Sequence, residues 1–82
     1  MSATVSLALR VVLVEDSAML RGMLCEMLAE LDGVGVVAEA EDEAGALAAL
    51  EAQRPDLAII DLELRTGSGL GVLRQLQAEP ER

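Results

Sequence analysis

Three short apolar segments alternate with three segments of helical periodicity, and this alternation is the feature that most constrains the fold. The apolar segments are residues 9–14, 34–40 and 57–60. They are apolar apart from Arg10 and Glu39, and apolar runs of this length are typical of strands that are buried on both faces of a parallel sheet. Strands that alternate with helices of about 10 to 15 residues form such sheets through crossover helices. The sequence therefore predicts a βαβαβα unit of the α/β class, a single domain over residues 9–79 with tails at 1–8 and 80–82.

The first expected helix, residues 18–31, carries a wide apolar stripe. Asp16 or Ser17 can cap its start, and Gly33 suits a left-handed conformation at its end. On a helical wheel the stripe extends over about half of the helix surface. Its members are four leucines and three methionines: Leu20, Leu24, Leu28, Leu31, Met19, Met23 and Met27.

The second helix is expected over about residues 42–53, and the third after a flexible glycine-rich loop at 63–69. Three acidic residues open the second helix, where the helix dipole favours negative charge. Each helix is expected to bury apolar side chains at helical spacing. These are Ala44, Leu47, Ala48 and Leu50 in the second helix and Leu70, Leu73 and Leu76 in the third.

Composition excludes several classes of function. Fifteen acidic and 6 basic residues give a net charge of −9, which disfavours nucleic-acid binding. Because histidine and aromatic residues are absent, His-based triads, His-based zinc sites and base stacking are excluded. The single cysteine, Cys25, cannot form an internal disulfide. No targeting signal or run long enough for a membrane span is present, so a cytoplasmic protein with no membrane partner is expected.

Acidic residues follow the first and third predicted strands. Glu15 and Asp16 come directly after residues 9–14, and Asp61 comes directly after residues 57–60. The carboxyl ends of neighbouring parallel strands meet at one edge of the sheet, where α/β proteins bind ligands. Each acid alone is explained as simply by a helix cap or a turn. If the first strand lies between the other two, however, the three carboxylates converge, and Mg²⁺ is the cation that suits them.

These motifs together resemble the receiver domain of bacterial two-component response regulators. The matching segments are residues 11–17, 36–40, 54–62 and 67–70, and the resemblance covers about residues 9–78. It implies a three-layer, partial flavodoxin-like fold with parallel strand order 2-1-3, lacking the last two strands and helices of a receiver. It also implies a role in phosphorelay signal transduction, with a sensor histidine kinase or another receiver as a partner.

The resemblance further implies the roles of four residues. Asp61 would be the phosphoacceptor, and Glu15 and Asp16 would be the acidic pair at Mg²⁺. Asp16 would be the direct ligand of the pair, and Glu15 would act through water. The main-chain carbonyl of Glu63 would be a further metal ligand.

The chain departs from the family pattern after the third helix. Receivers normally continue with two strands and two helices, whose Thr or Ser and Lys bind the phosphoryl oxygens and report phosphorylation. This chain stops earlier and contains no lysine, and Arg65 replaces a usual proline. We therefore expect a signalling module without the normal switch, and not an enzyme. The alternatives are a non-phosphorylated oligomerisation or decoy module derived from a receiver, and the first half of a longer protein.

Packing considerations predict a homo-oligomer. Right-handed crossovers place the first helix alone on one face of the sheet and the other two helices on the opposite face. The third strand then has an open edge, which pairs readily with another chain. Methionines such as Met19, Met23 and Met27 adapt to interfaces, so the first helix and the third-strand edge are the expected contact surfaces. The alternative is that these methionines fill a loose core.

Overall fold

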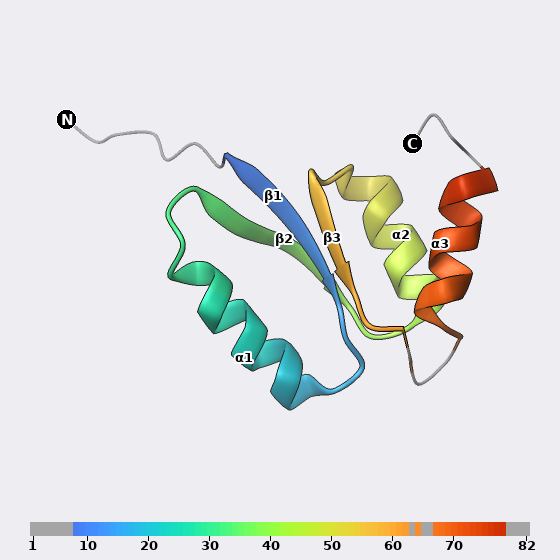
Figure 1. Ribbon diagram of the computed structural model, residues 1–82, viewed down its shortest axis with the longest axis horizontal. Coiled ribbons are helices and arrows are strands. Elements are labelled where there is room, and N and C mark those ends of the chain that lie inside the picture. The colour runs from blue at the N-terminus through green and yellow to red at the C-terminus, as the bar shows by residue number, and fades with distance from the viewer. Residues whose placement is uncertain (1–7, 63, 65–66, 79–82) are drawn as a thin grey trace.

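A three-stranded parallel sheet lies at the centre of the molecule (Figure 1). The computed structural model describes residues 8–62, 64 and 67–78. The strands are β1 (Leu9–Val14), β2 (Val34–Ala40) and β3 (Leu57–Ile60), with the bounds that the sequence predicts. Their order is β2-β1-β3, and both pairings are parallel. The predicted partial flavodoxin-like topology is therefore confirmed.

The central strand β1 is the most buried element. Val11, Val12 and Leu13 have no exposed surface, and Val14 is only 1% exposed. Aliphatic side chains on both faces of β1 are buried because it has a neighbour on each side and helices above and below. The acidic residues that follow Val14 therefore extend from the most buried strand of the described domain.

Three helices cover the two faces of this sheet. Helix α1 (Ala18–Ala29) lies on one face, and α2 (Glu43–Gln53) and α3 (Gly69–Ala78) lie together on the other (Figure 1). This is the arrangement expected from right-handed crossovers. The larger core forms between the sheet and α2 and α3, and its buried members are Val12, Val14, Ala40, Ala46, Leu50, Leu64 and Val72.

The buried faces of α2 and α3 differ from the predicted ones. In α2, Ala46 is completely buried, whereas Ala44 and Ala48 are exposed. In α3, Val72 is completely buried, whereas Leu70 and Leu73 are 50% and 43% exposed. Leu47, Leu50 and Leu76 do contribute to the core as expected. Both helices carry apolar residues around much of their circumference, so periodicity alone could not decide which side faces the sheet.

Two predicted boundaries also change. Helix α1 ends at Ala29 instead of residue 31, because the chain turns through Glu30 and reaches Gly33 (φ 77°) before β2. The glycine-rich segment is shorter than the predicted loop at 63–69, since Gly69 is already the first residue of α3. Gly69 and Gly71 are therefore helical residues, and the prediction of a flexible loop was wrong for Gly69.

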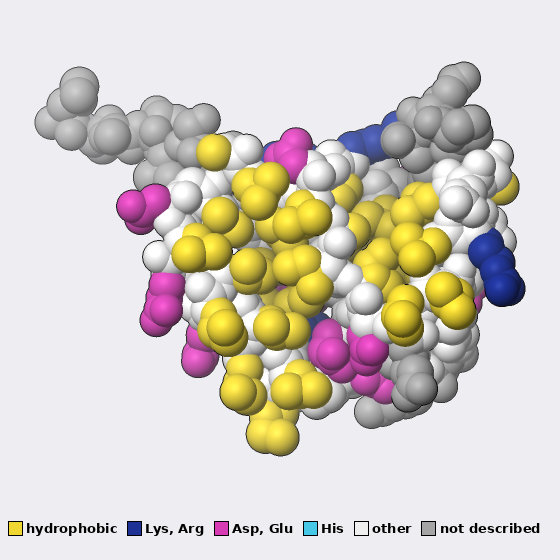
Figure 2. All heavy atoms as spheres, in the orientation of Figure 1, with side chains coloured by type: hydrophobic (Ala, Val, Ile, Leu, Met, Phe, Trp, Pro, Cys, Tyr) yellow, Lys and Arg dark blue, Asp and Glu magenta, His cyan; other side chains and the backbone are white. Residues whose placement is uncertain are grey.

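Helix α1 is only lightly covered. All of its residues are at least partly exposed, and the methionine side of its stripe faces solvent: Met19, Met23 and Met27 are 73%, 53% and 62% exposed. Figure 2 shows hydrophobic side chains gathered over a broad face of the molecule. Among residues 8–62, 64 and 67–78, no helix is both long and apolar enough to cross a membrane.

Candidate metal centre

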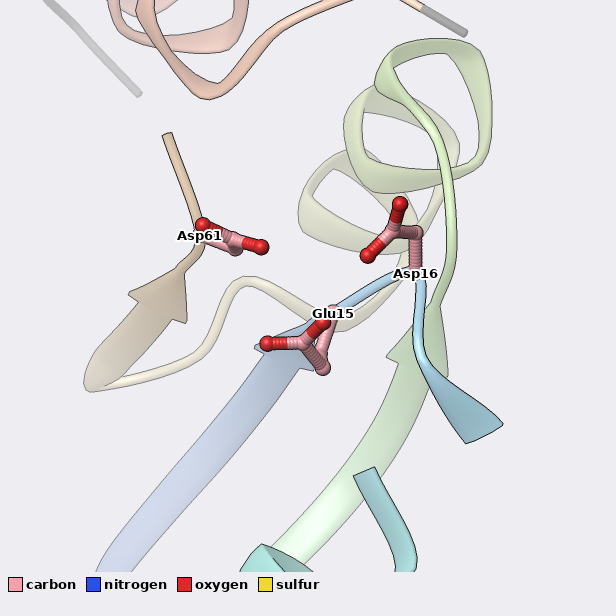
Figure 3. Close-up of side chains that lie close together, drawn as sticks. All are labelled: Glu15, Asp16 and Asp61. Carbon is pink, nitrogen blue, oxygen red and sulfur yellow. The ribbon is translucent and has the colours of Figure 1, made fainter. Parts of the chain in front are cut away.

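Three carboxylates meet at the carboxyl edge of the sheet. Glu15 and Asp16 follow β1, and Asp61 follows β3 (Figure 3). One oxygen of each side chain lies within 4.8 Å of those of the other two. Glu15 is buried, with 8% of its surface exposed, and the other two are half-buried. The structure thus brings together the three acids for which the sequence predicts convergence.

The backbone of β1 and the start of α1 orient Glu15 and Asp16. The Glu15 amide donates to the Ala40 carbonyl (3.0 Å), which fixes the end of β1 against β2. The Ser17 amide donates to Glu15 Oε2 (3.0 Å), so this carboxylate is held from its own chain. Ser17 Oγ accepts from the Leu20 amide (3.3 Å), which makes Ser17 the cap of α1. Capping therefore does not account for Asp16.

The parallel pairing of β1 and β3 positions Asp61. Its amide donates to the Val14 carbonyl (2.9 Å), one residue before Glu15. This bond continues the ladder of β1 and β3 past the last paired residues, Val14 and Ile60. Glu63 and Arg65, the other loop residues singled out in the sequence, lie outside the described residues.

Arg21 is a supporting residue that sequence reasoning missed. Its Nη1 atom donates to the Glu15 carbonyl (2.7 Å), and its Nε atom forms an ion pair with Glu39 (3.2 Å). It therefore ties α1 to the ends of both β1 and β2. Because Arg21 lies one turn after Ser17 in the first helix, the sequence places it near the acidic residues. No motif indicated that it would bond to the Glu15 carbonyl and to Glu39.

The donor set fits Mg²⁺. Hard carboxylate oxygens are the ligands that this ion takes, usually one or two together with waters and phosphate oxygens. One oxygen of each acid lies within 4.8 Å of the other two, so Asp16, Glu15 and Asp61 would hold such a cation directly or through water. Three neighbouring negative charges also repel one another in the absence of a cation.

Burial and the charge of Glu39 raise the pKa of the Cys25 thiol. Cys25 of α1 is half-buried, and desolvation is the main reason that its pKa is raised, followed by the charge of Glu39 and a hydrogen bond to it. Arg21 opposes this shift. A raised pKa leaves less thiolate at a given pH, and thiolate is the nucleophilic form.

We expect Cys25 to react with iodoacetamide at pH 8 more slowly than a cysteine in an unfolded peptide. Glu39→Gln should accelerate alkylation severalfold, because the charge of Glu39 would be removed while Arg21 remains. Mass spectrometry of timed samples measures both rates. An unchanged rate in Glu39→Gln would contradict this explanation of the raised pKa.

Comparison with known proteins assigns the family. The family model described as the response regulator receiver domain matches residues 11–82. The chain belongs to this family. As a receiver domain it is a module of two-component signal transduction, and receiver domains bind Mg²⁺ in an acidic pocket.

Two curated relatives show how much of a longer protein this receiver domain corresponds to. It is 40% identical over 73 residues to a protein-glutamate methylesterase/protein-glutamine glutaminase of Myxococcus xanthus, covering 89% of this chain and 21% of that protein. The corresponding protein of Koribacter versatilis is 37% identical over 68 residues, covering 83% and 19%. The receiver domain thus spans about a fifth of these curated relatives.

Two solved structures share its fold. The response regulator domain of Thermotoga maritima CheB superposes with a TM-score of 0.82 at 27% identity, covering 87% of this chain and 53% of that one. A LuxR-family response regulator of Aurantimonas sp. SI85-9A1 gives a TM-score of 0.82 at 28% identity, covering 89% and 53%. The described strands and helices therefore correspond to about half of each solved chain.

Proposed function

We propose that this receiver domain accepts a phosphoryl group on Asp61, with Mg²⁺ held beside it by Asp16 and Glu15. The observation that carries this proposal is the convergence of the three carboxylates, from two strands, within 4.8 Å at one edge of the sheet. Asp61 is half-buried and its backbone amide bonds to the Val14 carbonyl, so its main chain is held while its side chain remains partly accessible. These are the requirements for a carboxylate that acts as a nucleophile.

The reaction is a phosphoryl transfer to a carboxylate oxygen. An oxygen of Asp61 forms a new bond to phosphorus, while the bond between phosphorus and the leaving group of the donor breaks. The electron pair of that bond leaves with the donor, and the product is an acyl phosphate on Asp61. Mg²⁺, when bound, offsets the negative charge on the transferred oxygens.

The two acids after β1 have separate roles in this proposal. Asp16 is half-buried and is not needed as the cap of α1, so it is the direct ligand. Glu15 is held by the Ser17 amide through one oxygen and acts on the cation through water. The main-chain carbonyl of Glu63 is the further ligand, by similarity to the family.

Residues 1–82 contain no histidine, so the phosphohistidine that donates the group lies outside this domain. A sensor histidine kinase supplies the group from a phosphohistidine, which is the source used by the family. The methylesterase and glutaminase activities are those named for the relatives, of which this domain spans about a fifth. We propose for this domain a signalling role and no catalytic activity of its own.

The experiment that tests the proposal measures covalent phosphorylation directly. The protein is incubated with acetyl phosphate and Mg²⁺, and its intact mass is recorded by mass spectrometry. One added phosphoryl group is expected, and chelation of Mg²⁺ should abolish it. An unchanged mass under conditions that phosphorylate another receiver domain would contradict the proposal.

A second function is favoured by the exposed apolar surface. We propose that α1 and the open edge of β3 bind a second copy of the chain. Nine large hydrophobic residues of the described part of the chain are exposed, among them the three methionines of α1 and Leu57 of β3. Within the described residues β3 pairs only with β1, so its other edge is available for pairing. Surfaces of this kind mark interaction sites in soluble proteins.

Met23→Glu is expected to shift the protein toward the monomer, because a charge at the middle of this surface would be buried without a partner. Ala48→Glu is the matched control, since it adds the same charge at an exposed position of α2. Sedimentation velocity at several concentrations measures the species. The wild type and Ala48→Glu should sediment as dimers or larger, and Met23→Glu mainly as a monomer. A monomeric wild type at every concentration would contradict the proposed association.

A further inference from the structure

The start of α3 contains half of a capping box. Ser68 precedes the helix, its carbonyl accepts from the Val72 amide (3.2 Å), and its Oγ atom accepts from the Gly71 amide (2.9 Å). In a complete box, a glutamate or glutamine at the position of Gly71 accepts from the amide of the cap residue. Gly71 has no side chain, so α3 cannot supply this second acceptor itself.

Glu43 supplies the missing acceptor from another helix. The Ser68 amide donates to Oε1 of Glu43 (2.9 Å), the first residue of α2. The carboxylate lies where a side chain on Gly71 would begin: an ideal Cβ there would contact Oε1 and would lie 2.6 Å from Glu43 Cδ. Gly67, with a φ of 83°, is equally close to the Glu43 side chain. Both glycines therefore leave the space that Glu43 occupies.

The same turn of α3 touches the backbone of Asp61. The Gly69 amide donates to the Leu62 carbonyl (3.1 Å). An ideal Cβ on Gly69 would contact the Asp61 carbonyl oxygen and would lie 2.9 Å from Leu62 Cα. Glu43 bonds to the Ser68 amide, and the next residue, Gly69, packs against the main chain of Asp61. The two contacts are therefore separated by a single peptide bond.

We propose that Glu43 is a positioning residue for the acidic site, an inference that rests on the proposed function. Its carboxylate completes the cap of α3 from α2, and the negative charge is favourable at a helix N-terminus. The capped first turn holds Gly69 against the main chain of Asp61 and Leu62. Asp61 is thereby fixed from α3 as well as from β1, and its carboxylate keeps its place beside Glu15 and Asp16.

Three variants distinguish the effect of the Glu43–Ser68 hydrogen bond from the effect of the Glu43 charge. Glu43→Ala removes both, Glu43→Gln keeps an acceptor oxygen without the charge, and Glu41→Ala removes the same charge from an exposed position two residues earlier. Mg²⁺ affinity is measured by calorimetry, and the rate of phosphorylation by acetyl phosphate by intact mass. Glu43→Ala should lower Mg²⁺ affinity severalfold, less than the loss of about tenfold that follows removal of a residue bonded directly to a metal ligand, because Glu43 acts on Asp61 through Ser68 and Gly69. Glu43→Gln and Glu41→Ala should stay within about twofold of the wild type.

Hydrogen exchange gives a readout on the metal-free protein. Amide exchange at Ser68 and Gly69 should accelerate by at least about tenfold in Glu43→Ala and much less in Glu43→Gln, because an unprotected amide exchanges freely. The amides of β1 should be unchanged in all three variants. Faster exchange throughout the protein would indicate general destabilisation and would overturn the positioning role.

Gly71→Ala tests the same contact without removing Glu43. The added methyl group would displace the carboxylate from the Ser68 amide, so Mg²⁺ affinity should fall as in Glu43→Ala. In the Glu43→Ala background, Gly71→Ala should cause no further loss, because the space is then empty. If the wild type binds no Mg²⁺, the proposed function fails and this inference fails with it. If the wild type binds Mg²⁺ and Glu43→Ala binds it equally well, only this inference is overturned.

Discussion

Asp61→Asn is expected to take up no phosphoryl group from acetyl phosphate, whereas the wild type takes up one. The carboxamide has nearly the shape of the carboxylate, but it carries no charge and is a poor nucleophile. The Asp61 amide that pairs with the Val14 carbonyl is unchanged, so the end of β3 should stay in place. Intact-mass spectrometry of both proteins after the same incubation with Mg²⁺ measures the difference.

The matched control for this variant lies at the other end of the same strand. Asp56 precedes β3, and its Oδ2 atom accepts from the Arg10 amide (2.8 Å). An asparagine at this position can still accept that bond, so Asp56→Asn should be phosphorylated like the wild type. A phosphoryl adduct on Asp61→Asn at the level of the wild type would place the acceptor elsewhere and would refute the assignment.

Asp16→Asn is expected to weaken Mg²⁺ binding by at least about tenfold, the lower end of what even outer-shell substitutions cost a metal site. The variant changes the proposed direct ligand of the pair and removes one of three converging charges. Helix α1 should be unaffected, because Ser17 and not Asp16 provides its cap. Isothermal titration calorimetry of Mg²⁺ into each protein gives the affinities, and phosphorylation of Asp61 should slow in parallel.

Asp42→Asn provides the corresponding control for charge and capping. Asp42 lies at the same edge of the sheet and caps α2 by accepting from the Gly45 amide (2.7 Å). Asparagine caps helices about as well as aspartate, so the fold should be retained. If Asp42→Asn weakened Mg²⁺ binding as much as Asp16→Asn, the effect would be one of net charge and the proposed ligand role would be wrong.

The sheet and the convergence of the acids could be predicted from the sequence because both depend on local patterns. Runs such as Val11–Val14 and Leu57–Ile60 identify buried strands without knowledge of their partners. The handedness of crossovers then leaves few orders for three strands, and the observed order places Asp61 beside Glu15 and Asp16.

Contacts between distant segments could not be predicted in the same way. Ala46 and Val72 are the buried residues of helices that carry apolar side chains on several sides, and the choice of face depends on how α2 packs against α3. The Arg21 contacts with Glu15 and Glu39 join three elements. The bond from Ser68 to Glu43 joins residues 25 positions apart. Short motifs give no information about such pairs, because each partner is an ordinary surface residue in the sequence.

The most direct test of the central claim is a Mg²⁺ titration of the wild-type protein followed by NMR of its backbone amides. The claim is that three carboxylates from two strands form one cation site. We predict that the amides of residues 15–17 and 61–62 shift together, saturate along one binding curve, and respond only weakly in Asp16→Asn. Small, unsaturated shifts spread over all acidic segments, with no common curve for these residues, would contradict it.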